Sequence, residues 1–132
     1  MIRNVTAAGG IGSGASSITA VAGEYAGEGI RLENVHITCK GGGHLLASYA
    51  PVPEKKESDG VYPDPAYIIP GDQPAYGFFC RHVRGLEFRD VQVAFEKADR
   101  RAALICEDVQ GLVTEGFEAE RIPGAAPSVI IR

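Results

Sequence analysis

The sequence has little of several features that would assign it to a common functional class. It contains no apolar run long enough for a transmembrane helix, and its start lacks the charged, apolar and small-residue segments of an export signal. Lysine and arginine number 13 against 17 acidic residues, a formal net charge of −4, so no basic surplus attracts nucleic acid. We therefore expect neither a membrane protein nor a nucleic-acid-binding protein, and the cellular compartment stays open.

Cysteine is also scarce, and its number is odd. Cys80 and Cys106 are separated by 26 residues (106 − 80 = 26), and Cys39 has no partner at that spacing. We expect the first two thiols to stack in a dry interior, with a disulfide between them as the alternative. A metal site is a less favoured interpretation of the cysteines than either of these, and the glycine-rich residues 9–14 lack the Lys-Ser or Lys-Thr of a phosphate-binding loop. We expect no metal and no cofactor.

What the sequence does contain is a segment that repeats itself. Residues 77–93 align with residues 103–119 at a constant step of 26 (103 − 77 = 26), with Cys80 over Cys106. A period of this length indicates a stack of similar units, because one such unit cannot bury its apolar face alone.

Further copies lie on both sides of this pair. Asn4 aligns with Asn34 at a step of 30 (34 − 4 = 30), and residues 29–37 align with residues 85–93 at a step of 56 (85 − 29 = 56). The large step is explained by residues 41–74, which hold six prolines and no sustained periodicity, so we expect one long inserted loop. Towards the end, the step of 26 predicts that Ile130 follows Leu104 (104 + 26 = 130) and that a third copy opens there.

The apolar pattern within each copy indicates strands. Leu86, Phe88, Val91 and Val93 come at spacings of two with one break, which is typical of strand, turn and strand and not of a helical stripe. Equivalent strands of successive units should pair in parallel, with their inward side chains in rows. The sequence thus predicts an all-β stack of about four turns, with rows formed by Phe78 and Leu104, Cys80 and Cys106, and Leu86 and Leu112.

Nearly the whole chain resembles the C-terminal part of polygalacturonase-like glycoside hydrolases, family 28. The resemblance is carried, in order, by residues 15–19, 30–43, 52–55, 62–65, 74–83 and 95–104. It implies a right-handed, single-stranded parallel β-helix of the pectin-lyase-like kind over residues 1–132, as one domain and as a piece of a longer β-helix. It also implies a secreted or periplasmic parent family that cleaves acidic, pectin-type polysaccharides.

The catalytic motifs of that family do not occur in this sequence. Its members use aspartates in Asn-Thr-Asp and Asp-Asp motifs, with a Gly-His-Gly and an Arg-Ile-Lys, whereas here Gly43-His44 is followed by Leu45. Hydrolysis of a glycoside requires two carboxyl groups at a defined separation. We therefore predict no catalytic residue, and a chain that is inactive alone.

Candidates for substrate binding lie in and after the long loop. Tyr62, Tyr67 and Tyr76 could form partly exposed platforms on which sugar rings stack, or they could fasten the loop to the strands. Arg81, expected to point outward beside Tyr76, and His82 could bind the carboxylates of an acidic polysaccharide or oligosaccharide. Arg81 is the first choice.

Two alternatives remain open. His82 and Asp108 hold equivalent places in successive copies, so they form either a structural ladder at a turn or, with a nucleophile nearby, a proton-transfer pair. The chain could also be a free-standing structural or carbohydrate-binding module that forms a homo-oligomer through its open ends, because both ends begin or stop within strand-like sequence.

Overall fold

The structure, a computed structural model, describes residues 1–8, 16–19, 26–52, 54 and 73–132 of the 132-residue chain. In this part of the chain, eight strands form one parallel sheet and one short helix lies beside it, which confirms the all-β prediction. The elements are β1 (Ile2–Ala8), β2 (Ser16–Thr19), β3 (Ala26–Gly41), α1 (Leu45–Tyr49), β4 (Ala75–Lys97), β5 (Ala102–Gln110), β6 (Val113–Glu115), β7 (Glu118–Ala119) and β8 (Val129–Ile131).

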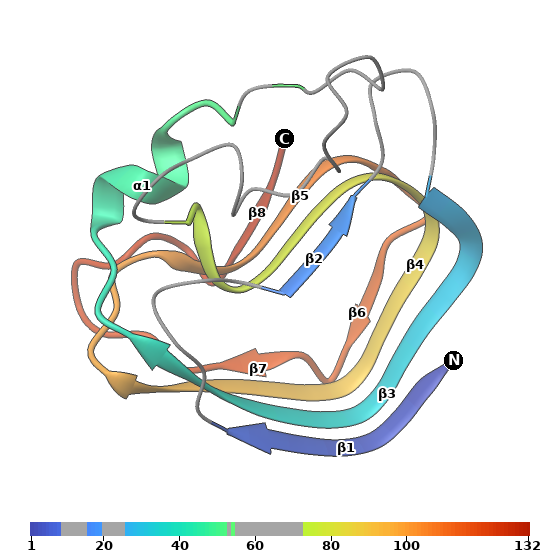
Figure 1. Cartoon of the computed structure of the whole chain (residues 1–132), viewed down its shortest axis with the longest axis horizontal. Coiled ribbons are helices and arrows are strands. Elements are labelled where there is room, and N and C mark those ends of the chain that lie inside the picture. The colour runs from blue at the N-terminus through green and yellow to red at the C-terminus, as the bar shows by residue number, and fades with distance from the viewer. Residues whose placement is uncertain (9–15, 20–25, 53, 55–72) are drawn as a thin grey trace.

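The long strands bend, and the shorter strands lie along parts of them. β1, β3 and β4 follow the same curved course side by side in Figure 1, and β5, β6 and β7 together follow β4. The order β1-β3-β4-β5-β8 is that of successive copies in the sequence, with β2, β6 and β7 also paired to β4. Equivalent positions of the repeat are therefore neighbours in space.

The strand registers reproduce three of the predicted steps. Ile2 pairs with Leu32 at a step of 30 (32 − 2 = 30), and Leu32 pairs with Phe88 at a step of 56 (88 − 32 = 56). Cys80 pairs with Cys106 at the predicted step of 26 (106 − 80 = 26). The equivalences read from the sequence are confirmed for β1, β3, β4 and β5.

The register predicted for the last strand is wrong by one residue. Leu104 pairs with Val129 and not with Ile130, a step of 25 (129 − 104 = 25). Because β7 still follows the step of 26, with Val93 opposite Ala119 (119 − 93 = 26), the missing residue belongs to the connection between β7 and β8. Connections absorb such length changes readily, since no strand pairing depends on them.

The strands bend where the backbone takes positive φ, and these residues are stacked. One such column consists of Asn4, Asn34, Asp90 and Gly116, with φ of 55°, 52°, 52° and 67°. Asn34 Nδ2 donates to Asn4 Oδ1 at 2.9 Å, so the column is also joined through its side chains. Asn, Asp and Gly are the residues that tolerate this conformation best, which explains why they recur at this corner.

A second column is made of glycine alone. Gly29, Gly85 and Gly111 have φ of 68°, 67° and 68°. A Cβ on Gly85 would lie 3.0 Å from the backbone nitrogen of Gly29, so both the φ and the close approach of two chains require glycine there.

The inward side chains form the core in the predicted rows. Leu86, Phe88, Val91 and Val93 are at most 2% exposed, and Leu112 packs partly buried against the same cluster. Phe88 contacts two rings edge to face, at centroid distances of 5.2 and 5.7 Å. The apolar alternation therefore predicted the buried face correctly.

Cys80 and Cys106 stack as free thiols in this core. Both are fully buried, and they face each other in register. Hydrogen bonding to Cys106, together with burial, raises the pKa of Cys80. The structure agrees with stacked thiols, which the sequence favoured over a disulfide.

The segment between β3 and β4 is tied to the sheet at both of its ends. Asp99 and Arg101, 1% and 2% exposed, form a buried ion pair at 2.7 Å in the β4–β5 connection. Asp99 accepts the Gly43 amide at 3.0 Å, and Arg101 donates to the Gln73 carbonyl at 3.0 Å. The first and last described parts of the segment thus share one anchor.

The helix α1, which the sequence did not predict, supplies a second anchor. Ser48 Oγ donates to the Pro74 carbonyl at 2.7 Å and accepts the Ala102 amide at 2.8 Å. No described helix has the length and apolarity to span a membrane.

Candidate functional site

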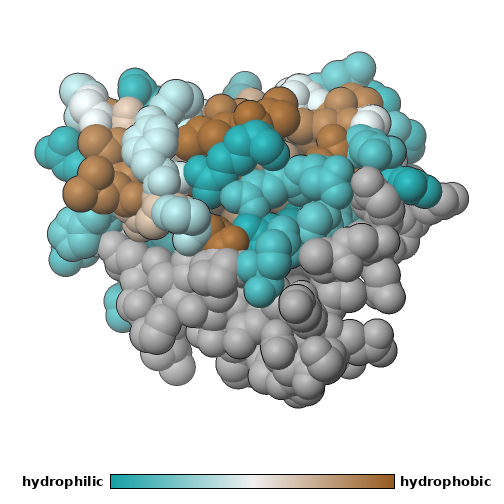
Figure 2. Space-filling view, turned by 90° about the horizontal axis from the view of Figure 1, so that it is seen from above, coloured by the Kyte–Doolittle hydropathy of each residue, from teal (hydrophilic) through white to brown (hydrophobic). Residues whose placement is uncertain are grey.

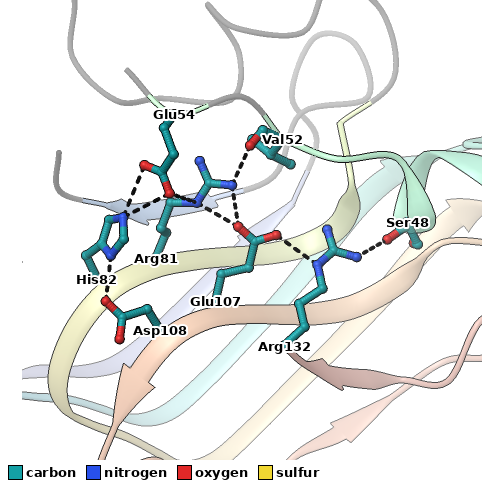
Figure 3. A network of polar contacts seen from close by, with 8 residues as sticks. All are labelled: Ser48, Val52, Glu54, Arg81, His82, Glu107, Asp108 and Arg132. Carbon is teal, nitrogen blue, oxygen red and sulfur yellow. Dashed lines mark hydrogen bonds and ion pairs between the residues drawn. The ribbon is translucent and has the colours of Figure 1, made fainter. Parts of the chain in front are cut away.

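Arg81 lies under the described part of the segment between β3 and β4 and not on an open surface. Its side chain is 6% exposed and donates from Nε to Glu107 at 2.7 Å and from Nη2 to the Val52 carbonyl at 2.7 Å (Figure 3). Its guanidinium also lies 5.2 Å from the centroid of the Phe79 ring. Arg81 does lie on the outer face of β4, next in sequence to the inward Cys80, but Val52 and Glu54 cover it there, so it is not the exposed ligand contact that its outward position suggested.

His82 lies between two carboxylates. Its Nδ1 is 2.7 Å from Asp108 Oδ2, and its Nε2 is 3.1 Å from both carboxylate oxygens of Glu54 (Figure 3). Burial lowers the pKa of His82, but its hydrogen bonds to Asp108 and Glu54 outweigh burial, so the pKa is raised. His82 and Asp108 have φ of 57° and 50°, so these two residues from equivalent places of the repeat lie in contact at a bend of their strands.

Glu107 joins Arg81 to Arg132, the last residue of the sequence. Its Oε1 accepts from Arg132 Nε at 2.8 Å, and Arg132 also donates to the Ser48 carbonyl in α1. Arg81 Nε lies 3.6 Å from Glu54 Oε1 as well. Within the described ranges no group of three or more His, Cys, Asp or Glu residues could hold a metal ion. The network therefore ties together β4, β5, α1 and the residues that follow α1 (Figure 3).

Tyr76 is part of the core. It is 1% exposed, its ring meets Phe95 edge to face at 5.3 Å, and its hydroxyl donates to the Glu120 carbonyl at 2.8 Å. Burial raises the pKa of Tyr76 well above its ordinary value. Of the two alternatives for Tyr76, a partly exposed platform or a side chain that fastens the loop, the platform is wrong, because the side chain alternates inward with Phe78. Tyr62, Tyr67 and the glycine-rich residues 9–14 lie outside the described residues.

A hollow that the sequence reasoning missed lies on the outer side of β1, β3, β4 and β7. It has a volume of about 540 Å³ and is lined by Thr6, His36, Ile37, Thr38, Gln92, Val93, Ala94, Glu118, Ala119 and Glu120. Thr6, His36, Gln92 and Glu118 are register partners on four adjacent strands, so they form one row of polar side chains.

The row could have been found from the repeat. Adding the steps of 30, 56 and 26 to Thr6 gives His36, Gln92 and Glu118 (6 + 30 = 36, 36 + 56 = 92, 92 + 26 = 118).

Comparisons with protein-family models, with curated proteins and with solved structures gave no match to this chain.

Proposed function

We propose that the chain is a segment of a right-handed parallel β-helix of the polygalacturonase-like kind. The parallel pairing of equivalent residues in successive copies and the stacked corners, above all the column from Asn4 to Gly116, support this arrangement. The right hand is supported by chain chirality, since crossovers between parallel strands of one sheet are almost always right-handed.

Within such a β-helix, the role we infer is to complete the stack and to contribute a wall to a carbohydrate-binding surface, without hydrolysis by this chain alone. The observation that carries this inference is the engagement of the three carboxylates around Arg81. Glu54 contacts His82, Glu107 contacts Arg81 and Arg132, and Asp108 contacts His82. Hydrolysis needs one carboxyl group as an acid and a second that attacks or activates water, and these three are occupied by ion pairs instead.

A reducing-sugar assay on polygalacturonate and rhamnogalacturonan tests the inactive role. We expect no turnover from the wild-type chain or from the Glu107→Gln and Asp108→Asn variants. Turnover that persists through purification and disappears in either variant would refute the proposal, since it would show that a carboxylate of this network acts in catalysis. Circular dichroism of each variant establishes that it is folded.

The alternative function, a self-associating structural or binding module, is supported by one observation. Every residue of β1 is exposed, including Ile2 at 50% and Val5 at 37%, although their partners Leu32 and Val35 are buried at 4% and 2%. Exposed apolar side chains, and a strand edge that no other described strand pairs, favour pairing with another chain. Other large apolar side chains are also exposed, and Figure 2 shows separate groups of hydrophobic residues at the left and along the top of the view, among hydrophilic ones.

Size-exclusion chromatography with light scattering separates the two functions. If β1 mediates association, the wild-type chain is a discrete oligomer and Val5→Lys makes it monomeric. Leu46→Lys is the matched control, because Leu46 is 76% exposed on α1 and not on β1. A monomeric wild-type chain would exclude association through this edge at the concentrations measured.

A further inference from the structure

The hollow beside β1, β3, β4 and β7 has the geometry of a binding site for an extended ligand. Its polar row crosses four adjacent strands, from Thr6 through His36 and Gln92 to Glu118. Neighbouring strands lie about 4.8 Å apart, so the row offers one polar side chain at each step over a length of about 14 Å. A regular spacing of this kind fits a ligand with a repeating unit.

The chemistry of the lining favours hydroxyl groups as the ligand's contacts. Thr6 and Thr38 carry hydroxyls, Gln92 carries an amide, and His36 carries an imidazole, so the lining offers both hydrogen-bond donors and acceptors. Each sugar hydroxyl both donates and accepts a hydrogen bond. Ile37 and Val93 line the hollow as well, but their side chains pack into the core, so the half-buried methyl of Ala94 supplies the apolar contact that pockets for small ligands combine with a few polar groups.

The charge of the lining distinguishes between kinds of sugar. Glu118 and Glu120 both line the hollow, and none of the residues that line it, all within the described ranges, is a lysine or an arginine. A carboxylate on the ligand would meet like charges and no cation, which costs affinity. The side chains of Arg81 and Arg101, by contrast, are nearly buried and engaged in ion pairs.

We propose that this hollow binds an uncharged oligosaccharide along the row from Thr6 to Glu118 and discriminates against uronic-acid chains. The inference rests on the carbohydrate-binding role proposed above and narrows its ligand class. It places the binding side chains away from Arg81 and His82, which act in the network that anchors the segment before β4.

Isothermal titration of the full chain tests the proposal with defined probes. The probes are the neutral hexasaccharides of glucose, xylose, mannose and galactose, and hexagalacturonate as the acidic probe. We expect at least one neutral probe to bind, with hexagalacturonate at least about tenfold weaker. Gln92→Ala should weaken the neutral complex by about tenfold, the effect of losing one or two hydrogen bonds.

A second experiment removes the negative charges of the hollow and measures whether the preference for neutral sugars is lost. In the double variant Glu118→Gln and Glu120→Gln, the affinity for hexagalacturonate should rise while the affinity for the neutral probe changes little. Glu96→Gln is the matched control, because Glu96 is an exposed carboxylate of β4 outside the hollow. It should change neither affinity.

The outcomes separate this inference from the proposed function. Hexagalacturonate binding as tightly as the best neutral probe would overturn the inference and leave the carbohydrate-binding role intact. Absence of binding to every probe would overturn the inference together with that role. Turnover in the reducing-sugar assay is a separate result, and it would refute only the inactive role.

Discussion

Asp90 holds a corner of β4 at a φ of 52°, where a side chain must tolerate the left-handed region. We predict that Asp90→Val lowers the free energy of unfolding by about 1–2 kcal/mol, because a β-branched side chain is strained there. Asp90→Asn should stay close to the wild type, since Asn keeps the same tolerance. Urea denaturation of both variants gives the comparison, and equal losses in the two would mean that the carboxylate and not the backbone stabilises this corner.

Gly116, which is stacked on Asp90, should tolerate substitution poorly for two reasons. A Cβ at Gly116, where φ is 67°, would lie 2.6 Å from Asp90 Oδ1, so strain and a close contact coincide. The corner thus combines a requirement on φ with a requirement on size.

His82 makes the stability of the chain depend on pH near neutrality. Its pKa is raised by Asp108 and Glu54, while Arg81 and Glu107 are the other charged groups of the network around it. A histidine with a raised folded-state pKa stabilises fully below its unfolded pKa of about 6.5, and this contribution is lost as pH rises through the folded value. We therefore predict that the wild-type melting temperature falls as pH rises from about 6 to about 8.

His82→Asn should flatten this dependence, because Asn tolerates the φ of 57° but does not titrate. His36→Asn is the control, since it makes the same substitution at an exposed histidine on β3. Calorimetry across the pH range measures both. A slope that survives His82→Asn would assign the pH dependence to another group.

The connection between β4 and β5 depends on a buried ion pair. We predict that Asp99→Asn lowers the free energy of unfolding by roughly 3–5 kcal/mol, because it leaves the buried Arg101 without its counter-ion. Glu115→Gln is the control. It removes the ion pair between Arg89 and Glu115, whose side chain is 68% exposed, so it should cost much less than Asp99→Asn. Chemical denaturation measures both, and similar effects would show that the buried pair is not an anchor.

The sequence predicted well those strands whose inward positions and pairing follow directly from the repeat. Apolar alternation and equal spacing placed Leu86 and Phe88 inward and set the pairing of Cys80 with Cys106. The register of β8 was missed because the connection before it is shorter by one residue, and connection length leaves no mark on the apolar pattern.

The site was harder to predict for a related reason. The outward position of Arg81 followed from alternation within its own strand, but its burial follows from the covering segment, whose residues Val52 and Glu54 have no periodicity. The row through His36 and Gln92, in contrast, was available from the register steps. The alternation within a strand does not show which distant segment covers it, whereas the repeat does show which residues stack.

Taken together, the strands form a nearly one-dimensional stack whose layers depend on their neighbours. β4 pairs with β2, β3, β5, β6 and β7, whereas β1 pairs within the described residues with β3 alone. In such stacks stability is approximately a sum over adjacent interfaces, so a strand with one interface opens more easily than a strand enclosed on both sides.

Hydrogen exchange therefore provides a test at the level of the complete chain. We predict that the amides of β1 exchange with an opening free energy close to zero, while those of β4 approach the global free energy of unfolding. The reason is that all of β1 is exposed, whereas β4 holds Leu86, Phe88 and Val91 in the core. Mass spectrometry after exchange at two protein concentrations gives the measurement.

Protection of β1 that increases with concentration would mean that a second copy covers Ile2 and Val5, and it would favour the self-associating module. Protection of β1 equal to that of β4 at every concentration would contradict the layered picture itself, because a strand with one neighbour would then be as stable as a strand enclosed by two.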